Sequence, residues 1–366
     1  MRAEAIIDLS AIKHNVALLK EKSGTDLLAV VKADAYGHGL VPVAKAALDA
    51  GASMLGVALL EEAISLREAG ITAPILAWLV QPGSDFAKAI ELDIELAAGS
   101  LKALHEIQAA STNKKARVHL ELDTGMTRGG FLSEWAELSA ADVAGVDIVG
   151  VFSHFARADE PSEKQNIDQL NRFNEMASHL AGLGITSLMR HLSNSAATLT
   201  NTDAAFDMVR TGIAIYGLTP DVAMGCSKDL GLRPAMQLRA ALYLVKEVPA
   251  ETPVGYGASE STTRDTKLGV VTMGYADGIP RIAHNAGVWI NGKRAPIIGR
   301  VSMDQFVVDL GPDSTAKSGD WVVVFGNGSH GEYTADDWGA ASGSINYEIV
   351  TRIGPRVPRI YSAHVY

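Results

Sequence analysis

The stretch LLAVVKADAYGHGLVPVAKAALDAG, residues 27–51, joins an apolar run to an Ala- and Leu-rich segment through a polar loop. The run at 27–31 is typical of a buried strand, and the segment at 40–51 has helical spacing and ends on Gly, a common helix stop. The strand runs directly into Lys32. Because lysine is among the residues least often buried, Lys32 either leaves into solvent or has a function.

The same unit of strand, turn and helix recurs along the first two-thirds of the chain. The predicted strands are residues 27–31, 54–59, 74–80, 93–98, 117–122, 147–155, 187–192 and 206–210, with helical segments between them. Eight such strands predict an α/β fold with a parallel (β/α)8, TIM-like barrel. A doubly wound sheet is the alternative, but it suits fewer strands and usually carries a Gly-rich dinucleotide turn, and no G-x-G-x-x-G opens a helix here.

The pattern changes after residue 232. Short alternating runs follow at 242–248, 268–278, 288–293, 305–310 and 321–328, with Asn–Gly turn pairs at 291–292 and 327–328. They predict a C-terminal, mostly antiparallel β domain with a late helix near residues 335–343. We therefore expect a barrel domain over residues 1–232, whose first few residues can pair with the second domain, and a β domain over 233–366.

Composition narrows the class of protein. Of 366 residues, 47% are hydrophobic and 20% charged, which supports a large core and argues against disorder. A net charge of −10 without runs of like charge argues against nucleic acid or an anionic membrane as the main partner. The single cysteine, Cys226, rules out an internal disulfide and a thiolate metal cluster, so we expect no metal. With neither a signal peptide nor a membrane span in the sequence, we expect a cytoplasmic protein.

Polar side chains stand where the predicted barrel strands end. Lys32 ends the first strand, Arg128 follows the fifth and His154 ends the sixth. HLSNSAAT (191–198) follows the seventh strand and RTGI (210–213) the eighth. Catalytic groups of such barrels lie at these carboxyl ends, which predicts one site there.

A phosphate position is predicted in the last two loops. Asn194 and Ser195 precede an Ala-rich helix, and the amides of Gly212 and Ile213 follow the eighth strand. A phosphorylated ligand that also reaches Lys32 suggests pyridoxal 5'-phosphate, because a lysine in a dry site becomes nucleophilic and forms a Schiff base. Two alternatives stay open: Asn194 and Ser195 are only helix caps, or the barrel acts on a sugar or nucleotide phosphate without this cofactor.

Eight collinear motifs carry a resemblance over nearly the whole chain. They are AVVKADAYGHG (29–39), LDTGMTRGG (122–130), SHFARADE (153–160), HLSNSAAT (191–198), FDMVRTGIAIYG (206–217), GYADG (274–278), GRVSMDQ (299–305) and INYEI (345–349). Together they resemble the alanine racemase family. The resemblance implies a pyridoxal-phosphate enzyme that interconverts L- and D-alanine for peptidoglycan. It also implies a head-to-tail homodimer in which each site is completed by the partner's β domain.

The resemblance implies two bases. Lys32 matches the lysine that forms the internal aldimine and acts as one base, and Tyr256 in TPVGYGAS matches the second base, delivered across the dimer. Racemisation needs a base on each face of the α-carbon. Since free tyrosine has a pKa near 10, the site would have to lower it. The structural alternatives are a surface lysine at a strand exit and a Gly-Tyr-Gly turn with an aromatic plug.

Arg210 matches the arginine that faces the pyridine nitrogen. Because arginine stays charged, that nitrogen would stay unprotonated, which limits transamination. The other residues that the resemblance assigns to the cofactor are Tyr36, His154, His191, Asn194, Ser195, Gly212, Ile213 and Tyr347. The structural alternatives are a salt-bridge arginine and ordinary core histidines.

On the substrate side, Arg128 matches the arginine that binds the substrate carboxylate, Met303 and Asp304 match substrate contacts from the partner, and Tyr275 matches an entrance residue. The departure from the family that matters is at Glu121, where the family commonly has a lysine, often carbamylated; Gly255 and Ser302 replace a commoner serine and cysteine, and we expect neither to abolish the chemistry. The glutamate supplies the negative charge unmodified, so we expect activity that is independent of dissolved carbon dioxide. The alternative is that Glu121 pairs elsewhere in the barrel.

Other functions remain open from the sequence. A racemase of serine or of a broader set of amino acids would use the same residues. A non-catalytic carrier of the cofactor would resemble the barrel alone, and the β domain with Tyr256 argues against it. A fold-related decarboxylase would need a cysteine motif in the β domain, which is absent.

Overall fold

The computed structural model describes residues 1–362, and these fall into two compact units. The barrel unit comprises residues 12–35 and 40–232. The C-terminal unit comprises residues 1–11, 36–39 and 233–362. The segment 36–39 therefore belongs to a different unit from Lys32, although only a few residues separate them in the chain.

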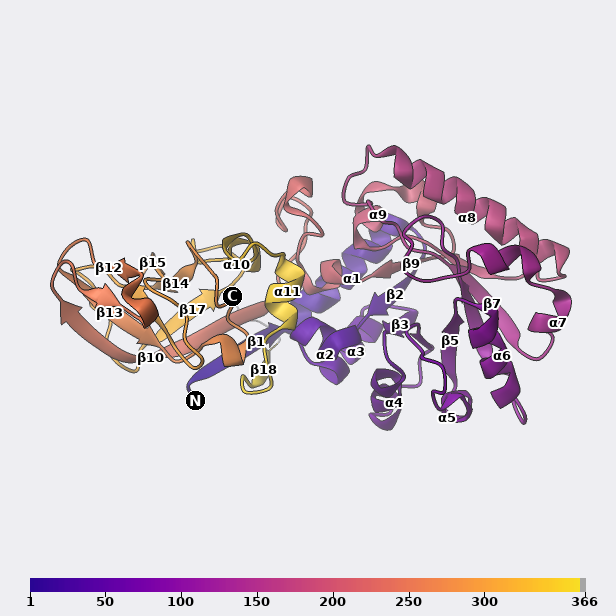
Figure 1. Ribbon diagram of the computed structural model, residues 1–366, viewed down its shortest axis with the longest axis horizontal. Coiled ribbons are helices and arrows are strands. Elements are labelled where there is room, and N and C mark those ends of the chain that lie inside the picture. The colour runs from indigo at the N-terminus through magenta and orange to yellow at the C-terminus, as the bar shows by residue number, and fades with distance from the viewer. Residues whose placement is uncertain (363–366) are drawn as a thin grey trace. The chain divides into compact units, whose positions relative to one another are not determined.

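Eight parallel strands form the barrel unit's sheet, in the order β8-β7-β6-β5-β4-β3-β2-β9, which confirms the predicted barrel (Figure 1). Hydrogen bonds from Asp207 N–H to the Arg190 carbonyl (3.1 Å) and from Arg210 N–H to the Ser193 carbonyl (2.8 Å) join the two ends. The strands are β2 (Asp26–Val30), β3 (Met54–Val57), β4 (Ile75–Ala77), β5 (Ile94–Ala98), β6 (Arg117–Glu121), β7 (Asp147–Phe152), β8 (Met189–His191) and β9 (Met208–Thr211).

Helices surround these strands (Figure 1). They are α1 (Leu9–Ser23), α2 (Lys32–Gly37), α3 (Leu40–Asp49), α4 (Leu60–Glu68), α5 (Phe86–Glu91), α6 (Leu101–Ala110), α7 (Ala140–Val143), α8 (Lys164–Gly182) and α9 (Ser195–Thr200). Short 3-10 turns are η1 (Ser133–Glu137), η2 (Thr202–Ala204), η3 (Ile213–Tyr216) and η4 (Val222–Met224). Of these, α1 and α2 each have residues in both units.

The apolar runs form strands because both faces of a parallel barrel sheet are covered. Every residue of β3, β4, β5 and β9 is buried. Gly56 in β3 leaves room for the side chains of Leu28 and Trp78, since a Cβ there would overlap both. The predicted strand at 147–155 is too long, because β7 ends at Phe152 and the polar segment with His154 begins the loop.

The C-terminal unit is mostly antiparallel, as predicted. Its main path runs β15-β14-β17-β10-β1-β18, with β13 joining β10 to β16, and β1 pairs with β10 antiparallel and with β18 in parallel. A separate small sheet pairs β11 with β12. The strands are β1 (Ala3–Asp8), β10 (Met236–Val248), β11 (Pro253–Val254), β12 (Glu260–Ser261), β13 (Thr266–Val271), β14 (Gly287–Ile290), β15 (Lys293–Pro296), β16 (Phe306–Asp309), β17 (Trp321–Phe325) and β18 (Arg359–Ser362).

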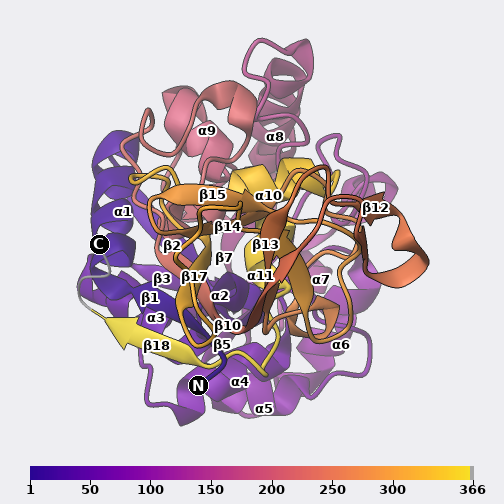
Figure 2. The same cartoon turned by 90° about the vertical axis from the view of Figure 1, so that its left-hand side faces the viewer.

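Two helices accompany these strands, α10 (Ala335–Ala341) and α11 (Asn346–Thr351), which lie next to each other (Figure 2). The predicted late helix is α10, whereas α11 was not predicted. The 3-10 turns of this unit are η5 (Tyr256–Ala258) and η6 (Tyr275–Asp277). Asn291 and Gly292, with φ angles of 51° and 81°, form the predicted hairpin turn between β14 and β15. Within residues 1–362, no helix is long and apolar enough to cross a membrane.

Candidate active site

The segment that begins at Lys32 is a left-handed helical turn, where the sequence indicated only a loop. Ala33, Asp34, Ala35 and Tyr36 have φ angles of 52–54°. This conformation costs L-residues about 1–2 kcal/mol each, so the surrounding structure must stabilise it. The Glu62 carboxylate does so at the start of the turn: Oε1 accepts the Ala33 N–H at 2.6 Å, and Oε2 accepts the N–H groups of Ala58 and Leu59 at 3.0 Å.

Lys32 follows β2 at its carboxyl end, half-buried. Burial lowers the pKa of its ammonium group, the positive charge of Arg128 lowers it further, and Glu62 opposes them. Its Nζ lies 5.8 Å from the centroid of the Trp78 ring. Burial and the charge of Arg128 favour the neutral amine, which is the nucleophilic and basic form, although the Trp78 ring attracts the ammonium.

Arg210 on β9 is buried and held by acceptors from β8 and from the loop after β7. Its Nη1 donates to the His191 carbonyl at 2.7 Å and to His191 Nδ1 at 3.2 Å. Its Nη2 donates to the Ser153 carbonyl at 2.6 Å and to His154 Nδ1 at 3.2 Å. Burial lowers the pKa of Arg210 to about 10, so the guanidinium remains charged at neutral pH.

His154 and His191 are both neutral. Burial, followed by the charges of Arg210, Arg128 and Lys32, lowers the pKa of His154 to about 3. Burial also lowers the pKa of His191 well below its usual value, and the ring is stacked on Phe152 with centroids 5.1 Å apart. Since Arg210 can only donate, each imidazole must offer it a lone pair.

The hydrogen-bonding groups of Arg210 and Thr211, near Lys32, fit pyridoxal 5'-phosphate. Among residues 1–362, Arg210 Nε has no acceptor, although both Nη atoms do, so one donor is left for a ring nitrogen. The neighbouring Thr211 Oγ1 is buried with no hydrogen-bond partner in the described chain. Lys32 and Arg210 belong to adjacent strand ends, because β2 pairs with β9.

The two predicted phosphate loops are joined by one hydroxyl. Ser195 Oγ accepts the N–H groups of Gly212 at 3.0 Å and Ala214 at 3.3 Å. Asn194 caps α9 by accepting the Ala197 N–H at 3.0 Å, which is the structural alternative considered for it. Ile213 begins η3 directly after Gly212. The structure thus brings Asn194, Ser195, Gly212 and Ile213 to one place in the barrel unit.

Glu121 ends β6 and lies near Arg128, in the loop that follows, without an ion pair between them. Across the described chain, the Glu121 carboxylate has no cation within 4.0 Å. Its oxygens lie beside the glycines at 99 and 129, where an added Cβ would stand 3.2–3.3 Å away. Burial raises the pKa of Glu121, against the charges of Arg210 and Arg128, in that order. Arg128 itself is exposed.

Tyr36 and Tyr347 meet in the C-terminal unit. Their ring centroids are 6.3 Å apart, and burial raises the pKa of Tyr36, so its hydroxyl stays protonated. A Cβ on Gly37 would overlap the Val350 carbonyl of α11, and Arg359 Nε donates to the Gly37 carbonyl at 2.9 Å. The close approach at Gly37 therefore holds Tyr36 beside α11.

Tyr256 stands at the tip of the β11–β12 hairpin and is 69% exposed. Gly255 and Gly257 on either side have φ angles of 70° and 77°, which favour glycine. The hairpin is fixed to the segment that precedes SMDQ, because Glu260 Oε2 accepts the Gly299 N–H at 3.1 Å. The backbone thus determines where the Tyr256 side chain lies, and that side chain faces solvent in this chain.

Tyr275, Met303 and Asp304 are brought together in the C-terminal unit. The N–H groups of Tyr275 and Ala276 donate to the carbonyls of Ser302 at 3.1 Å and Met303 at 3.0 Å. Only glycine fits at position 274, because a Cβ would overlap both carbonyls. Asp304 accepts from Arg356 Nη2 at 2.7 Å.

Several residues that shape the site were not singled out from the sequence. They are Glu62, Trp78, Glu95 and His119. Glu95 and His119 could have been found from the sequence, since each is a polar residue inside an otherwise apolar predicted strand. A polar side chain on a barrel strand must reach solvent, pair with another polar group or have a function.

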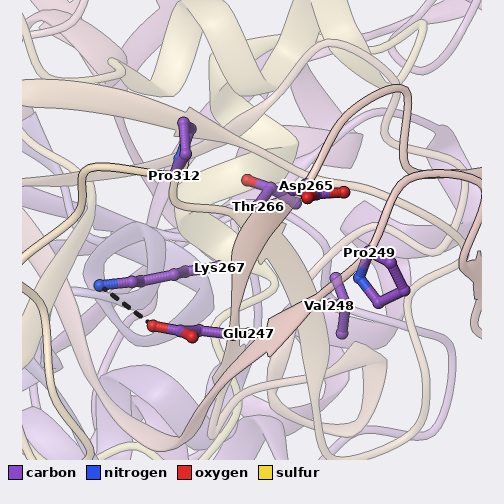
Figure 3. Close-up of a pocket in the computed structure, with 7 residues that line it drawn as sticks. All are labelled: Glu247, Val248, Pro249, Asp265, Thr266, Lys267 and Pro312. Atoms are coloured by element: carbon purple, nitrogen blue, oxygen red, sulfur yellow. Dashed lines mark ion pairs between the residues drawn. The ribbon is translucent and has the colours of Figure 1, made fainter.

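A surface pocket of the C-terminal unit lies away from all the predicted residues. It is lined by residues 247–249, by residues 265–267 and by Pro312, and an ion pair of 3.6 Å joins Lys267 to Glu247 at its wall (Figure 3). It contains none of the side chains described above. In the described part of the chain, no group of three or more His, Cys, Asp or Glu residues is arranged to hold a metal ion.

Comparison with known proteins accounts for both units. Residues 7–220 match the model of the alanine racemase N-terminal domain, and residues 235–361 that of its C-terminal domain. Curated alanine racemases of Salinispora arenicola and Frankia casuarinae are 50% and 49% identical, covering 98% and 99% of this chain and 98% and 96% of their own lengths. The crystal structure of alanine racemase from Streptomyces lavendulae is 47% identical with a TM-score of 0.97, covering 100% of this chain and 98% of that one. The chain belongs to the alanine racemase family.

Proposed function

We propose that this chain interconverts L- and D-alanine with pyridoxal 5'-phosphate as cofactor. Family membership supports the reaction, and the observation that carries the chemistry is the pair formed by Lys32 and Arg210. An amine of lowered pKa and a buried guanidinium with one free donor lie at the carboxyl ends of neighbouring strands of the barrel. When bound, the cofactor would withdraw electrons from the α-carbon of the substrate and so acidify its α-proton.

Lys32 is the first base. Its lowered pKa raises the fraction of neutral amine at neutral pH, which suits proton abstraction from one face of the α-carbon. Tyr256 is the second base and serves the opposite face. Its exposure in the single chain supports delivery to the barrel opening of a partner subunit. We therefore propose a head-to-tail homodimer with shared sites.

Arg210 limits the chemistry to racemisation. A guanidinium with a pKa of about 10 donates a hydrogen bond to a ring nitrogen without transferring its proton at neutral pH. By keeping the ring nitrogen of a bound cofactor unprotonated, Arg210 would favour return of the α-proton to carbon over loss of the amino group.

Arg128 would bind the substrate carboxylate, for which its bidentate donor geometry is suited. Glu121 would orient Arg128 through space or through water, since no direct ion pair joins them. Tyr36, Tyr347 and the groups around Ser195 would hold the phosphate. Tyr275, Met303 and Asp304 would line the entrance on the partner's side, and the product would serve peptidoglycan synthesis in the cytoplasm.

The test is chiral chromatography of alanine after incubation of the purified protein with the cofactor in deuterium oxide. L-alanine should yield D-alanine with deuterium at the α-carbon, and the Lys32→Ala variant should yield none. Borohydride reduction should attach the cofactor to Lys32 in the wild-type protein. Faster turnover of L-serine than of L-alanine, or an attached cofactor without any exchange, would contradict the proposal.

A further inference from the structure

A continuous chain of hydrogen bonds crosses the interior of the barrel behind Arg210. Glu95 Oε2 is 2.7 Å from His119 Nε2, His119 Nδ1 is 2.8 Å from His191 Nε2, and His191 Nδ1 is 3.2 Å from Arg210 Nη1. The four residues lie on β5, β6, β8 and β9 of one sheet. Their exposed fractions are 5%, 0%, 0% and 6%, so water cannot substitute for any of these partners.

Arg210 at one end and Glu95 at the other determine where His191 and His119 carry their protons. Arg210 can only donate, so His191 Nδ1 accepts and the His191 proton sits on Nε2. That proton is donated to His119 Nδ1, which leaves the His119 proton on Nε2 and directs it at Glu95. The reverse direction would set an N–H of His191 against an N–H of Arg210. Both imidazoles are therefore neutral Nε2–H tautomers between a cation and an anion.

Glu95 is ionised and anchored from outside the barrel. Burial raises the pKa of its carboxyl group, but the hydrogen bonds from His119 and Arg117, together with the positive charge of Arg117, outweigh burial, and the net shift is downward. Arg117, whose side chain is half-exposed, donates from Nε to Glu95 Oε1 at 2.8 Å. The oxygen that faces His119 is the other one, Oε2.

The backbone leaves room for this series of hydrogen bonds. The pairing of β6 with β7 shifts register between Val118 and His119, which sets Gly150 opposite His119. A Cβ on Gly150 would overlap the His119 ring at Nδ1, where the bond to His191 begins. A β-bulge commonly re-aims a side chain beside an active site. Phe152, on the same strand as Gly150, stacks on His191 with an interplanar angle of 9° and lies 5.3 Å from Arg210 Cζ.

We propose that Glu95 and His119 are positioning residues: they fix the tautomer of His191 and so hold the Arg210 guanidinium in the orientation that leaves Nε–H for the cofactor's ring nitrogen. The inference rests on the proposed function for the identity of that acceptor. Neither residue touches the cofactor or the substrate in this scheme, and both act through His191 and Arg210.

The first test needs neither cofactor nor variant. In the cofactor-free protein labelled with ¹⁵N-histidine, long-range ¹H–¹⁵N spectra should show His119 and His191 as pure Nε2–H tautomers across the neutral pH range. A cationic imidazole, or an Nδ1–H tautomer at either residue, would overturn the proposal.

The second test uses Glu95→Gln with Arg117→Gln as its matched control. An amide can either accept or donate at His119, so Glu95→Gln should populate a second tautomer of His119 and His191. Arg117→Gln removes only the outer contact of the same carboxylate and should leave both tautomers unchanged. Unchanged tautomers in Glu95→Gln would contradict the role of the carboxylate.

In the holoenzyme, the readout is the ratio of transamination to racemisation. Transamination of alanine releases pyruvate while the amino group passes to the cofactor, and a coupled lactate dehydrogenase assay measures it. Glu95→Gln should release several-fold more pyruvate per racemisation event, with KM little changed, and Arg117→Gln should match the wild type. An unchanged ratio would overturn the role. If wild-type protein shows the tautomers but no racemisation, the proposed function fails and the hydrogen-bonded chain stands.

Discussion

Two groups of predicted functional residues, one from each unit, are held in opposite ways. In the barrel unit, His154 and His191 are both hydrogen-bonded to Arg210, and all three residues are largely buried. In the C-terminal unit, Tyr256, Met303 and Tyr275 are 69%, 53% and 39% exposed, and only the backbone beneath them is fixed. The barrel residues therefore form a complete environment by themselves. The C-terminal residues present side chains outward, as expected of groups that complete a site elsewhere.

The largest expected effect tests the exposed side of this comparison. Tyr256→Phe should lower racemisation by about 10²–10⁴-fold, the usual contribution of a positioned acid or base. Exchange of the α-proton in deuterium oxide should survive for one enantiomer, because Lys32 still serves one face. Tyr243→Phe, which removes an equally exposed hydroxyl from the same unit, is the control and should be close to wild type. Exchange of both enantiomers at wild-type rates would show that Tyr256 is not a base.

Mixing two inactive variants tests whether each active site contains residues of both subunits. If sites are shared, a refolded equal mixture of Lys32→Ala and Tyr256→Phe should recover about a quarter of wild-type activity, since half of random dimers are mixed and each has one intact site. The change in activity is measured against either variant alone. A mixture no more active than its components would mean that Lys32 and Tyr256 of one site come from the same chain.

Glu121→Gln tests the buried residues of the barrel unit. Its KM for alanine should rise by about tenfold, or 1.4 kcal/mol, because Arg128 loses its anionic neighbour. Burial raises the folded-state pKa of Glu121, so the ionised carboxylate destabilises the folded protein above that pKa. The variant should therefore resist urea better than wild type at pH 8 and lose this advantage near pH 4. Unchanged KM would remove Glu121 from substrate binding, and activity that depends on dissolved carbon dioxide would contradict its unmodified role.

The pH dependence of stability tests the environment of Lys32. Its folded-state pKa lies below the unfolded value of 10.5, so the unfolded chain binds more protons between the two and stability rises with pH there. Lys32→Met should stabilise the cofactor-free protein at pH 7, and its advantage should shrink as the pH approaches 10.5. Urea titrations of both proteins between pH 7 and 10.5 measure this difference in the free energy of unfolding. A constant difference would mean that the amine is not perturbed.

The smallest expected effect concerns the left-handed turn. Ala33 is exposed with a φ of 54°, so Ala33→Gly should stabilise the cofactor-free protein by about 0.5–1 kcal/mol, the relief of strain less the entropy of glycine. Ala109→Gly, at an exposed position of the right-handed helix α6, should destabilise by a similar amount. Equal destabilisation in both variants would show that the turn is unstrained.

The sequence alone determined the architecture, because hydrophobic periodicity and glycine placement are local properties. Eight buried runs alternating with helices specify a parallel barrel, and the Asn–Gly pair at 291–292 specifies its hairpin turn. It also indicated which strand ends carry Lys32, His154 and Arg210. Motifs separated by tens of residues named the family before any contact was known.

Only the tertiary structure decided how those residues are held. The left-handed turn after Lys32 depends on Glu62, which is 29 positions away in sequence. The neutral state of His191 depends first on its burial and then on His119 and Arg210, which reach it from other strands. The assignment of residues 36–39 to the C-terminal unit depends on α11 and β18. Protonation and strain follow from burial and from partners distant in the chain, and neither can be read from a residue's own neighbours.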